Sequence, residues 1–238
     1  MMLRLLELYT SVQGECDRTG TPTTFVRFAG CNLTCAAWPC DSQFAIDPKL
    51  YRKEQQLVTP SDLLATVDNL ANETGTTNIC LTGGEPALQP MGDLEAVVLP
   101  ARHVYGYDLE MFSNGTLPYS EQLLSRCAVR LDWKLPGSGE AQSGKLWHQR
   151  IENYYAMSEY EHHTIKFTIK DVKDFEAARD IYEKFDMSAW PGSIYAGPVW
   201  GSNFTARDIV DGILTYKLPW KLNIQAHQYI WPANERGR

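Results

Sequence analysis

Short apolar runs that end in polar turns recur along the chain. These runs are rich in β-branched, aromatic and other apolar side chains, which is typical of buried strands. They cover residues 1–8, 23–28, 78–81, 108–112, 129–134, 164–170, 193–196 and 222–225. Several of them stop at Gly, Ser, Asn or Pro, so the pattern predicts strands that each end in a polar loop.

Amphipathic stretches separate many of these runs. Thr59 and Pro60 supply a cap and a first-turn proline for a helix. Its predicted apolar face consists of Leu63, Leu64, Val67 and Leu70. Further helices are predicted over about residues 172–185 and 206–216. Repeated strand–loop–helix units predict an α/β fold with a parallel sheet, curved or barrel-like, and a site at the carboxyl ends of its strands.

Length and composition narrow the picture further. The 238 residues contain no linker rich in Pro, Gly or Ser, so one domain over residues 1–238 is predicted. With 22 basic and 29 acidic side chains the net charge is -7, and no Lys/Arg cluster favours nucleic acid over a small-molecule partner. No run approaches the roughly 20 apolar residues of a membrane helix, and residues 1–8 do not resemble a signal peptide.

Three of the six cysteines, Cys31, Cys35 and Cys40, lie within ten positions. This usage favours a reducing compartment, the cytoplasm, and a bound metal over disulfides. Three thiolates can hold three corners of an iron–sulfur cube and leave its fourth iron open. A structural zinc site, completed by Cys16, a histidine or Asp41, is the alternative, although zinc sites usually use two separated cysteine pairs.

A second motif, Thr82-Gly83-Gly84-Glu85-Pro86, follows the run at residues 78–81. Taken alone, its glycines could form only a tight turn. Other segments accompany the two motifs: Ser-Val-Gln-Gly-Glu at 11–15, Arg27 four residues before the first cysteine, Cys-Asp-Ser at 40–42, Ser-Asn-Gly-Thr at 113–116, Asp-Trp-Lys-Leu-Pro-Gly-Ser-Gly at 132–139, and the ending at 225–238.

Together these segments resemble the radical S-adenosylmethionine (SAM) superfamily and, within it, the 7-carboxy-7-deazaguanine synthase family. The resemblance spans nearly the whole chain. Its cysteine motif and Gly-Gly-Glu-Pro turn are shared with many radical SAM enzymes, whereas the Gln-Gly-Glu segment and the histidine-containing ending select the family. The resemblance implies a partial (β/α) barrel with a curved, mostly parallel sheet.

The chemistry is implied by the same resemblance. Cys31, Cys35 and Cys40 would hold a [4Fe-4S] cluster whose open iron binds SAM, and reduction would release a 5′-deoxyadenosyl radical. The radical would take a hydrogen atom from 6-carboxy-5,6,7,8-tetrahydropterin, whose ring contracts with loss of ammonia to give 7-carboxy-7-deazaguanine, with Mg²⁺ assisting. The family further implies 7-deazapurine (queuosine/preQ0) biosynthesis, a homodimer and an electron donor such as flavodoxin or ferredoxin.

The family's site residues map onto this chain position by position. The implied substrate-binding residues are Val12, Gln13, Gly14, Glu15, Arg27, Thr82, His227 and Arg238, the last two in a C-terminal segment of about residues 221–238. The implied SAM-binding residues are Gly83, Gly84, Glu85, Ser113, Asn114, Asp132, Trp133, Lys134, Ala196, Gly197, Pro198 and Val199. Ser42, next to Cys40 and Asp41, is the implied Mg²⁺ ligand, because Mg²⁺ prefers oxygen ligands.

Each polar position also has an ordinary structural interpretation. The guanidinium of Arg27 suits a substrate carboxylate but could form a surface ion pair on its strand. Gln13 and Glu15 could read the amide and amidine edge of a pterin, or form a polar turn around Gly14. Ser42 could cap a helix. His227, expected near the end of the final strand, could be a hydrogen-bonded core residue.

One feature departs from the family pattern. The family usually has two residues between its second and third cysteines, whereas residues 36–39 place four between Cys35 and Cys40. Loop-closure entropy grows slowly with length and Pro39 restrains the loop, so a cluster remains expected. Two other functions stay open: a radical SAM activase that places a glycyl radical on a partner protein, and a non-catalytic zinc-binding protein.

Overall fold

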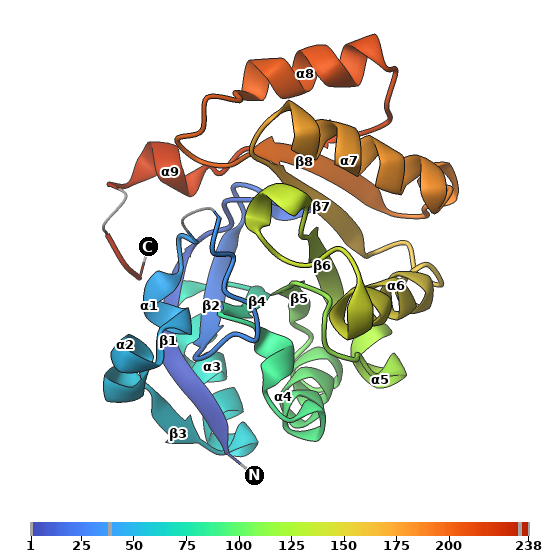
Figure 1. Ribbon diagram of the computed structural model, residues 1–238. Helices are drawn as coiled ribbons and strands as arrows, with labels where there is room; N and C mark the ends of the chain where they lie inside the picture. The colour runs from blue at the N-terminus through green and yellow to red at the C-terminus, as the bar shows by residue number, and fades with distance from the viewer. Residues whose placement is uncertain (1, 38–39, 233–234, 238) are drawn as a thin grey trace.

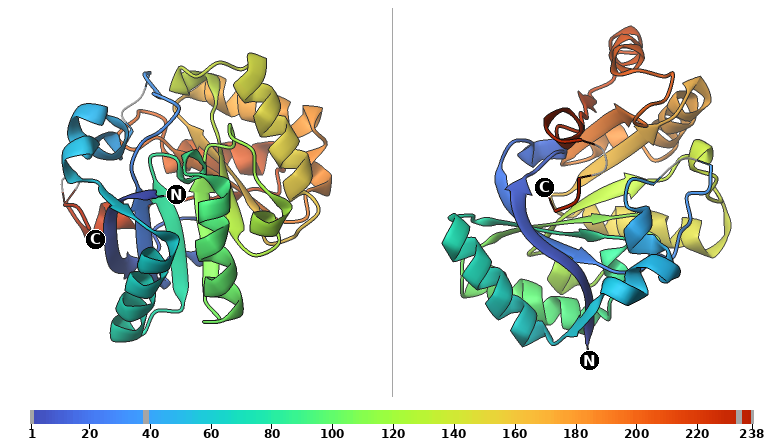
Figure 2. Two further views of the ribbon diagram at one scale, coloured as in Figure 1. Left: turned by 90° about the horizontal axis from the view of Figure 1, so that it is seen from below. Right: turned by 90° about the vertical axis from the view of Figure 1, so that its left-hand side faces the viewer.

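The computed structural model describes residues 2–37, 40–232 and 235–237. In this part of the chain nine strands form one open, curved sheet in the order β3-β1-β2-β4-β5-β6-β7-β8-β9 (Figures 1 and 2). The strands are β1 (Leu3–Val12), β2 (Pro22–Phe28), β3 (Gln56–Val58), β4 (Asn78–Gly83), β5 (Asp108–Ser113), β6 (Ala128–Trp133), β7 (Thr164–Ile169), β8 (Ser193–Pro198) and β9 (Lys221–Leu222). β1 is antiparallel to β2 and β3, and the strands from β2 to β9 are parallel. The predicted α/β class and curved, mostly parallel sheet are confirmed.

Helices lie on both sides of the sheet, and most of them cover its convex face (Figure 1). They are α1 (Gln43–Ile46), α2 (Pro48–Glu54), α3 (Pro60–Thr74), α4 (Met91–His103), α5 (Glu121–Leu124), α6 (Gly144–Met157), α7 (Val172–Lys184), α8 (Ala206–Thr215) and α9 (His227–Ile230), with short 3-10 turns at Cys16–Arg18, Pro86–Leu88, Pro136–Ser138 and Met187–Ala189. The Thr59 side chain caps α3 as predicted, by accepting from Asp62 N. Along α3 the buried face continues through Ala71, while Leu70 is only half-buried.

The two faces of the parallel strands differ sharply in chemistry. Because side chains alternate along a strand, each strand sends an apolar set toward the helices and a second set toward the concave side. The apolar core includes Val26, Phe28, Ile79, Leu81, Leu109, Met111, Val129, Leu131, Ile165 and Phe167. The side chains between them include Arg27, Cys80, Thr82, Phe112, Asp132 and Lys166, all of which line one cavity. The cavity is therefore formed by the positions that the core does not use.

The chain leaves the sheet earlier than predicted at its C-terminal end. Instead of a strand over 222–225, β9 ends at Leu222; Asn223 N still donates to Ala196 O (2.8 Å). The backbone then turns toward β1, where Ala226 N donates to Gly14 O (2.9 Å). The predicted strand over 222–225 therefore extends too far, and His227, expected near the end of that strand, begins the short helix α9 instead.

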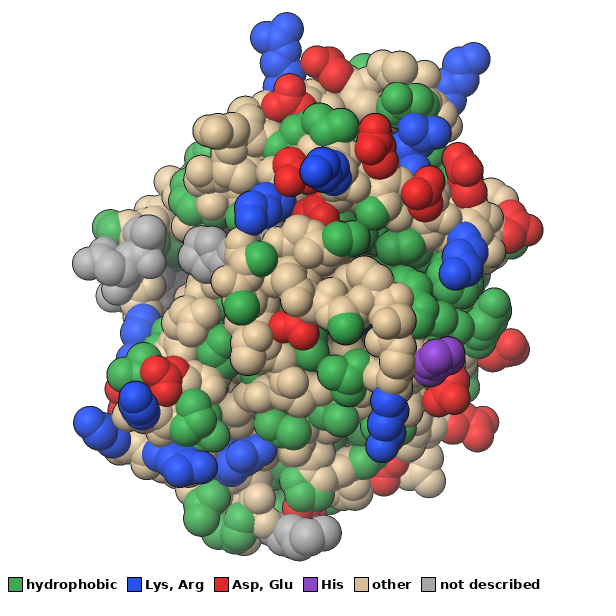
Figure 3. All heavy atoms as spheres, in the orientation of Figure 1, with side chains coloured by type: hydrophobic (Ala, Val, Ile, Leu, Met, Phe, Trp, Pro, Cys, Tyr) green, Lys and Arg blue, Asp and Glu red, His purple; other side chains and the backbone are tan. Residues whose placement is uncertain are grey.

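The surface has mixed charge on the face shown in Figure 3, where Lys/Arg and Asp/Glu side chains are interspersed. Within residues 2–37, 40–232 and 235–237, the helices are all too short or too polar to traverse a lipid bilayer.

Candidate active site

The cavity lies at the carboxyl ends of the parallel strands, where the predicted motifs meet. It is bounded by the segment at residues 12–15, the cysteine loop, the Gly-Gly-Glu-Pro turn, the ends of β5, β6 and β7, and α9. The predicted residues that line it are Val12, Gln13, Gly14, Glu15, Arg27, Cys31, Cys35, Cys40, Ser42, Thr82, Gly83, Gly84, Glu85, Ser113, Asn114, Asp132, Lys134 and His227. One cavity therefore gathers most of the residues that the motifs singled out.

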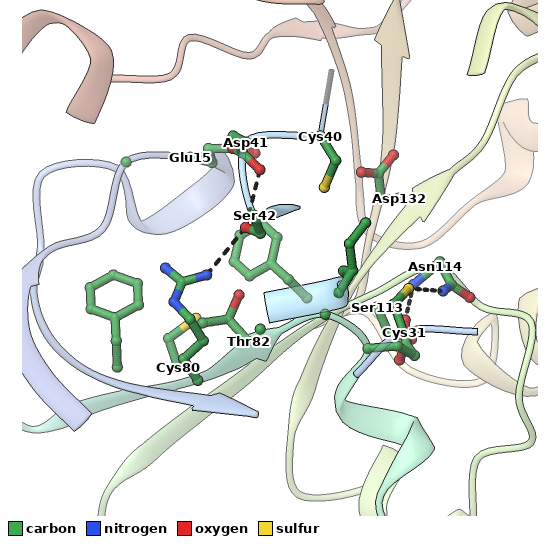
Figure 4. A pocket seen from close by; sticks show the side chains of 18 of the residues that line it. Glu15, Cys31, Cys40, Asp41, Ser42, Cys80, Thr82, Ser113, Asn114 and Asp132 are labelled. Carbon is green, nitrogen blue, oxygen red and sulfur yellow. Dashed lines mark hydrogen bonds between the residues drawn. The ribbon is translucent and has the colours of Figure 1, made fainter. Parts of the chain in front are cut away.

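The three motif thiols all face this cavity. Cys31 Sγ accepts from Leu33 N (3.4 Å) and from Asn114 Nδ2 (3.8 Å; Figure 4). Burial raises the pKa of Cys31 to about 12 and that of Cys40 to about 11. Cys35 is fixed by its backbone N–H, which donates to Glu140 Oε1 (2.7 Å). Soft thiol ligands with N–H donors around the sulfur fit an iron–sulfur cluster.

The three motif thiols do not form a closed ligand group in this structure. Across the described ranges, no three His, Cys, Asp or Glu side chains are grouped closely enough to hold a metal ion. Trp38 and Pro39, which belong to the longer segment between the second and third cysteines, lie outside the described residues. Cys16, a fourth ligand in the zinc alternative, is not among the cavity-lining residues.

The Gly-Gly-Glu-Pro turn is built against the strand that leads into the cysteine loop. A Cβ on Gly83 would lie 2.1 Å from Phe28 O, and one on Gly84 would lie 2.2 Å from Gly30 O. This close approach lets Gly84 N donate to Phe28 O (3.1 Å) and Glu85 N donate to Gly30 O (2.8 Å). Both glycines are needed because any side chain would push the two backbones apart.

Glu85 links this turn to the next one. Its carboxylate accepts from Ser113 Oγ (2.6 Å), Asn114 N (2.7 Å) and Ala87 N (3.0 Å). Burial raises the pKa of Glu85, an effect that these hydrogen bonds oppose. The Glu85 side chain thus orders two adjoining walls of the cavity, in addition to any contact with SAM.

Glu15 is held from three directions. Its carboxylate pairs with the Lys166 ammonium and accepts from Gln225 Nε2 (2.8 Å) and Asn223 Nδ2 (3.3 Å). Burial disfavours the charged form, but the Lys166 charge and the hydrogen bonds from Lys166 and Gln225 outweigh it and lower the pKa of Glu15. Glu15 is therefore an ionised acceptor at one end of the cavity. Lys166 was not predicted as a site residue from the sequence. The feature that could have identified it is its place on β7 between the core residues Ile165 and Phe167, which directs its side chain toward the cavity.

Gln13 shapes the turn that carries Glu15. Its Nε2 donates to the buried Glu110, and its Oε1 accepts from Gly14 N (2.9 Å) and Glu15 N (3.3 Å). Both ends of the amide are thereby engaged by the protein itself. Gly14 leaves room for His227, because a Cβ there would lie 2.3 Å from His227 Nδ1.

Arg27 forms the cationic centre of another wall. Its Nε pairs with Glu7 Oε2 (2.8 Å), and its two terminal nitrogens donate to Tyr9 OH (2.9 Å) and Ser42 Oγ (3.2 Å). The Arg27 and Glu7 side chains are only 15% and 16% exposed, so this is not the surface pair considered from the sequence. Ser42 stands at the N-cap of α1 without making a side-chain capping bond; it faces Arg27 and Asp41 instead (Figure 4).

The C-terminal segment closes over this wall. Arg236 pairs with Glu7 (2.8 Å) and Glu54 (2.9 Å), and its guanidinium carbon lies 3.9 Å from the Phe44 ring centroid. A second cavity beneath the segment shares Tyr9, Arg27, Asp41, Ser42 and His227 with the first. Glu7 and Tyr9 were not singled out in the sequence. Arg238 lies outside the described residues.

Five predicted SAM-binding residues do not line the cavity. Trp133 points into the core, where it packs against Trp147 and Tyr154, because strand alternation places it on the opposite face from Asp132 and Lys134. In the turn after β8, Val199 packs against the cluster of Leu33 and Cys35. The remaining three lie in β8 outside the cavity lining: Ala196, Gly197 and Pro198.

Known proteins resemble the chain over its whole length, although no protein-family model matches it. It is 32% identical over 244 residues to 7-carboxy-7-deazaguanine synthase of Clostridium acetobutylicum, covering 100% of both chains. It is 31% identical over 248 residues to the synthase of Koribacter versatilis, covering 99% of this chain and 100% of that one. The crystal structure of QueE from Escherichia coli shares the fold, with a TM-score of 0.70, 21% identity and 95% coverage of each chain.

Proposed function

The chain belongs to the 7-carboxy-7-deazaguanine synthase family, and we propose from this membership and from the cavity that it converts 6-carboxy-5,6,7,8-tetrahydropterin to 7-carboxy-7-deazaguanine with loss of ammonia. It is a radical SAM enzyme that uses a [4Fe-4S] cluster and SAM. The observation that carries the assignment of the site is that the three motif thiols, the Gly-Gly-Glu-Pro turn and Arg27 line one cavity.

The residues divide the cavity into parts with different chemistry. Cys31, Cys35 and Cys40 would hold the cluster, which when bound supplies the electron that cleaves SAM. The turns at Glu85 and at Ser113 to Asn114 form the walls next to Cys31, where they are placed to bind SAM. Lys134 and Asp132, paired at 2.8 Å, line the same cavity from β6.

The substrate-binding ends differ in charge. Arg27 presents a planar cation suited to a carboxylate, and Glu15 presents an ionised carboxylate suited to the N–H groups of a pterin edge. A ligand with a carboxylate at one end and N–H donors at the other matches this arrangement. Ser42 Oγ, 3.2 Å from Asp41 Oδ1, offers Mg²⁺ the oxygen ligands that it prefers.

The proposal also covers the oligomeric state, the reductant, the location and the pathway. The enzyme would be a cytoplasmic homodimer that receives its electron from a donor of the flavodoxin or ferredoxin class and acts in 7-deazapurine synthesis. The longer segment between Cys35 and Cys40 is expected to change the shape of the cluster loop without preventing assembly.

The direct test is product analysis. Protein reconstituted anaerobically with iron and sulfide is incubated with SAM, reductant, Mg²⁺ and the carboxytetrahydropterin, and we expect mass spectrometry to show 7-carboxy-7-deazaguanine and 5′-deoxyadenosine. SAM cleavage without the deazaguanine would favour the activase. Tightly bound zinc with no iron uptake would favour the zinc-binding protein.

Replacing Arg27 by alanine is expected to separate substrate turnover from SAM cleavage. Losing a charge-assisted, fork-shaped contact to a carboxylate should lower kcat/KM for the carboxytetrahydropterin by about 100-fold. SAM cleavage without substrate should stay within about threefold, because Arg27 faces Glu7, Tyr9 and Ser42. Arg102→Ala, at an exposed ion pair with Asp108, is the control. Equal turnover by Arg27→Ala and wild type would contradict the carboxylate-binding role.

A further inference from the structure

A buried lysine occupies the cavity next to the residue expected to bind the pterin edge. Lys166 lies on β7, and its side chain is 9% exposed. Its neighbours on the strand, Ile165 and Phe167, pack into the core, so strand alternation directs Lys166 to the concave side. Its ammonium pairs with Glu15 and lies 5.8 Å from the Phe112 ring centroid.

Lys166 also connects two walls of the cavity. Its position on β7 is in register with Asp132 on β6, and Lys166 Nζ lies 4.0 Å from Asp132 Oδ2. Glu15 comes from the loop after β1, which is otherwise held by Gln13 and by the C-terminal residues Asn223 and Gln225. Asn223 and Gln225 contribute neutral donors, whereas Lys166 contributes a full charge. A buried carboxylate is costly without such a counter-charge.

We propose that Lys166 is a positioning residue that fixes Glu15 as an ionised acceptor aimed at the substrate's heterocyclic edge, and that it thereby makes this end of the cavity prefer a 2-amino over a 2-oxo pteridine. The inference rests on the proposed function, because it assigns the pterin edge to Glu15. A 2-amino group donates hydrogen bonds to a carboxylate, whereas a 2-oxo group presents a second acceptor that the carboxylate repels.

Two ligands that differ at the 2-position, and in the N1 proton that the 2-oxo form carries, test the effect. 6-Carboxypterin and 6-carboxylumazine carry the same carboxylate, so the contact between this carboxylate and Arg27 should be the same for both. The first has a 2-amino group and the second a 2-oxo group. Equilibrium dialysis with the SAM-bound, reconstituted enzyme gives the ratio of their dissociation constants. For wild type we expect 6-carboxypterin to bind about 10- to 100-fold more tightly, the range for one hydrogen bond to a charged group.

Lys166→Met should reduce this preference to less than about threefold, because Glu15 loses its counter-charge and its fixed position. Lys166→Arg, which keeps the charge, should restore part of the preference. Lys221→Met is the matched control. Lys221 lies on β9, pairs with Asp17 through a largely exposed side chain, and does not line the cavity. An unchanged preference in Lys166→Met would overturn the proposal.

The Glu15→Gln variant separates positioning from direct binding. If Lys166 acts through Glu15, adding Lys166→Met to Glu15→Gln should leave the remaining preference unchanged within about twofold. A further loss in the double variant would show that Lys166 acts independently, and would overturn the proposal. The double variant buries no unpaired charge, so this comparison decides even if Lys166→Met alone does not fold. Failure of wild type to bind either ligand, or to form the deazaguanine, would instead refute the proposed function.

Discussion

Cys35→Ala is expected to abolish SAM cleavage and cluster binding together. In the proposed site the three motif cysteines would each bind one of the cluster's four irons, so removing one would leave two irons without a protein ligand. The substitution adds no backbone strain, because alanine meets the same left-handed φ of 44° as the cysteine. Iron content, the visible absorption of the reconstituted protein and 5′-deoxyadenosine formation should all fall to background.

Cys127→Ala supplies the matched control for this experiment. Cys127 is fully buried in the apolar core, and its loss should cost only about 1 kcal/mol of stability. Its iron content and SAM cleavage should equal those of wild type. Full iron content and cleavage in Cys35→Ala would remove Cys35 from the ligand set and with it the proposed cluster site.

Arg130→Met is expected to cause a large loss of stability. Arg130 Nε pairs with Glu110 Oε2 at 3.1 Å, with side chains 4% and 0% exposed, and its Nη1 pairs with Asp17 at 3.0 Å. Removing the cation strands a fully buried carboxylate, which typically costs about 3–5 kcal/mol. The free energy of unfolding in urea should fall by that amount and the Tm by roughly 10 °C.

Arg102→Met makes the same substitution at an exposed pair. Arg102 Nη1 lies only 2.6 Å from Asp108 Oδ1, but the two side chains are 43% and 54% exposed. The free energy of unfolding should therefore fall by less than about 1 kcal/mol. Replacing Glu110 as well as Arg130 by methionine should recover much of the lost stability, because no unpaired charge remains. Equal losses for Arg130→Met and Arg102→Met would contradict the importance of burial.

Buried contacts between residues far apart in the sequence also explain why some site residues could be predicted from sequence and others could not. Gln13 was recognised within its motif, but its side chain bonds Glu110, 97 positions away, and so shapes the turn. Lys166 belongs to no motif and becomes relevant only because β7 lies beside β6 and the loop after β1 reaches over it. The family resemblance implies Trp133 as a SAM-binding residue together with Asp132 and Lys134, whereas strand alternation directs its side chain into the core.

Local patterns determined the α/β class, most strand positions, the cap of α3 and the grouping of motifs at the carboxyl ends of the strands. These features depend on residues within a few positions of one another, where side-chain periodicity and turn chemistry act directly. The tertiary structure alone decided that β9 ends at Leu222, that His227 sits against Gly14, and which charges become partners within the cavity. Those outcomes depend on strand order and register, which bring distant segments together and select which side chains share a face.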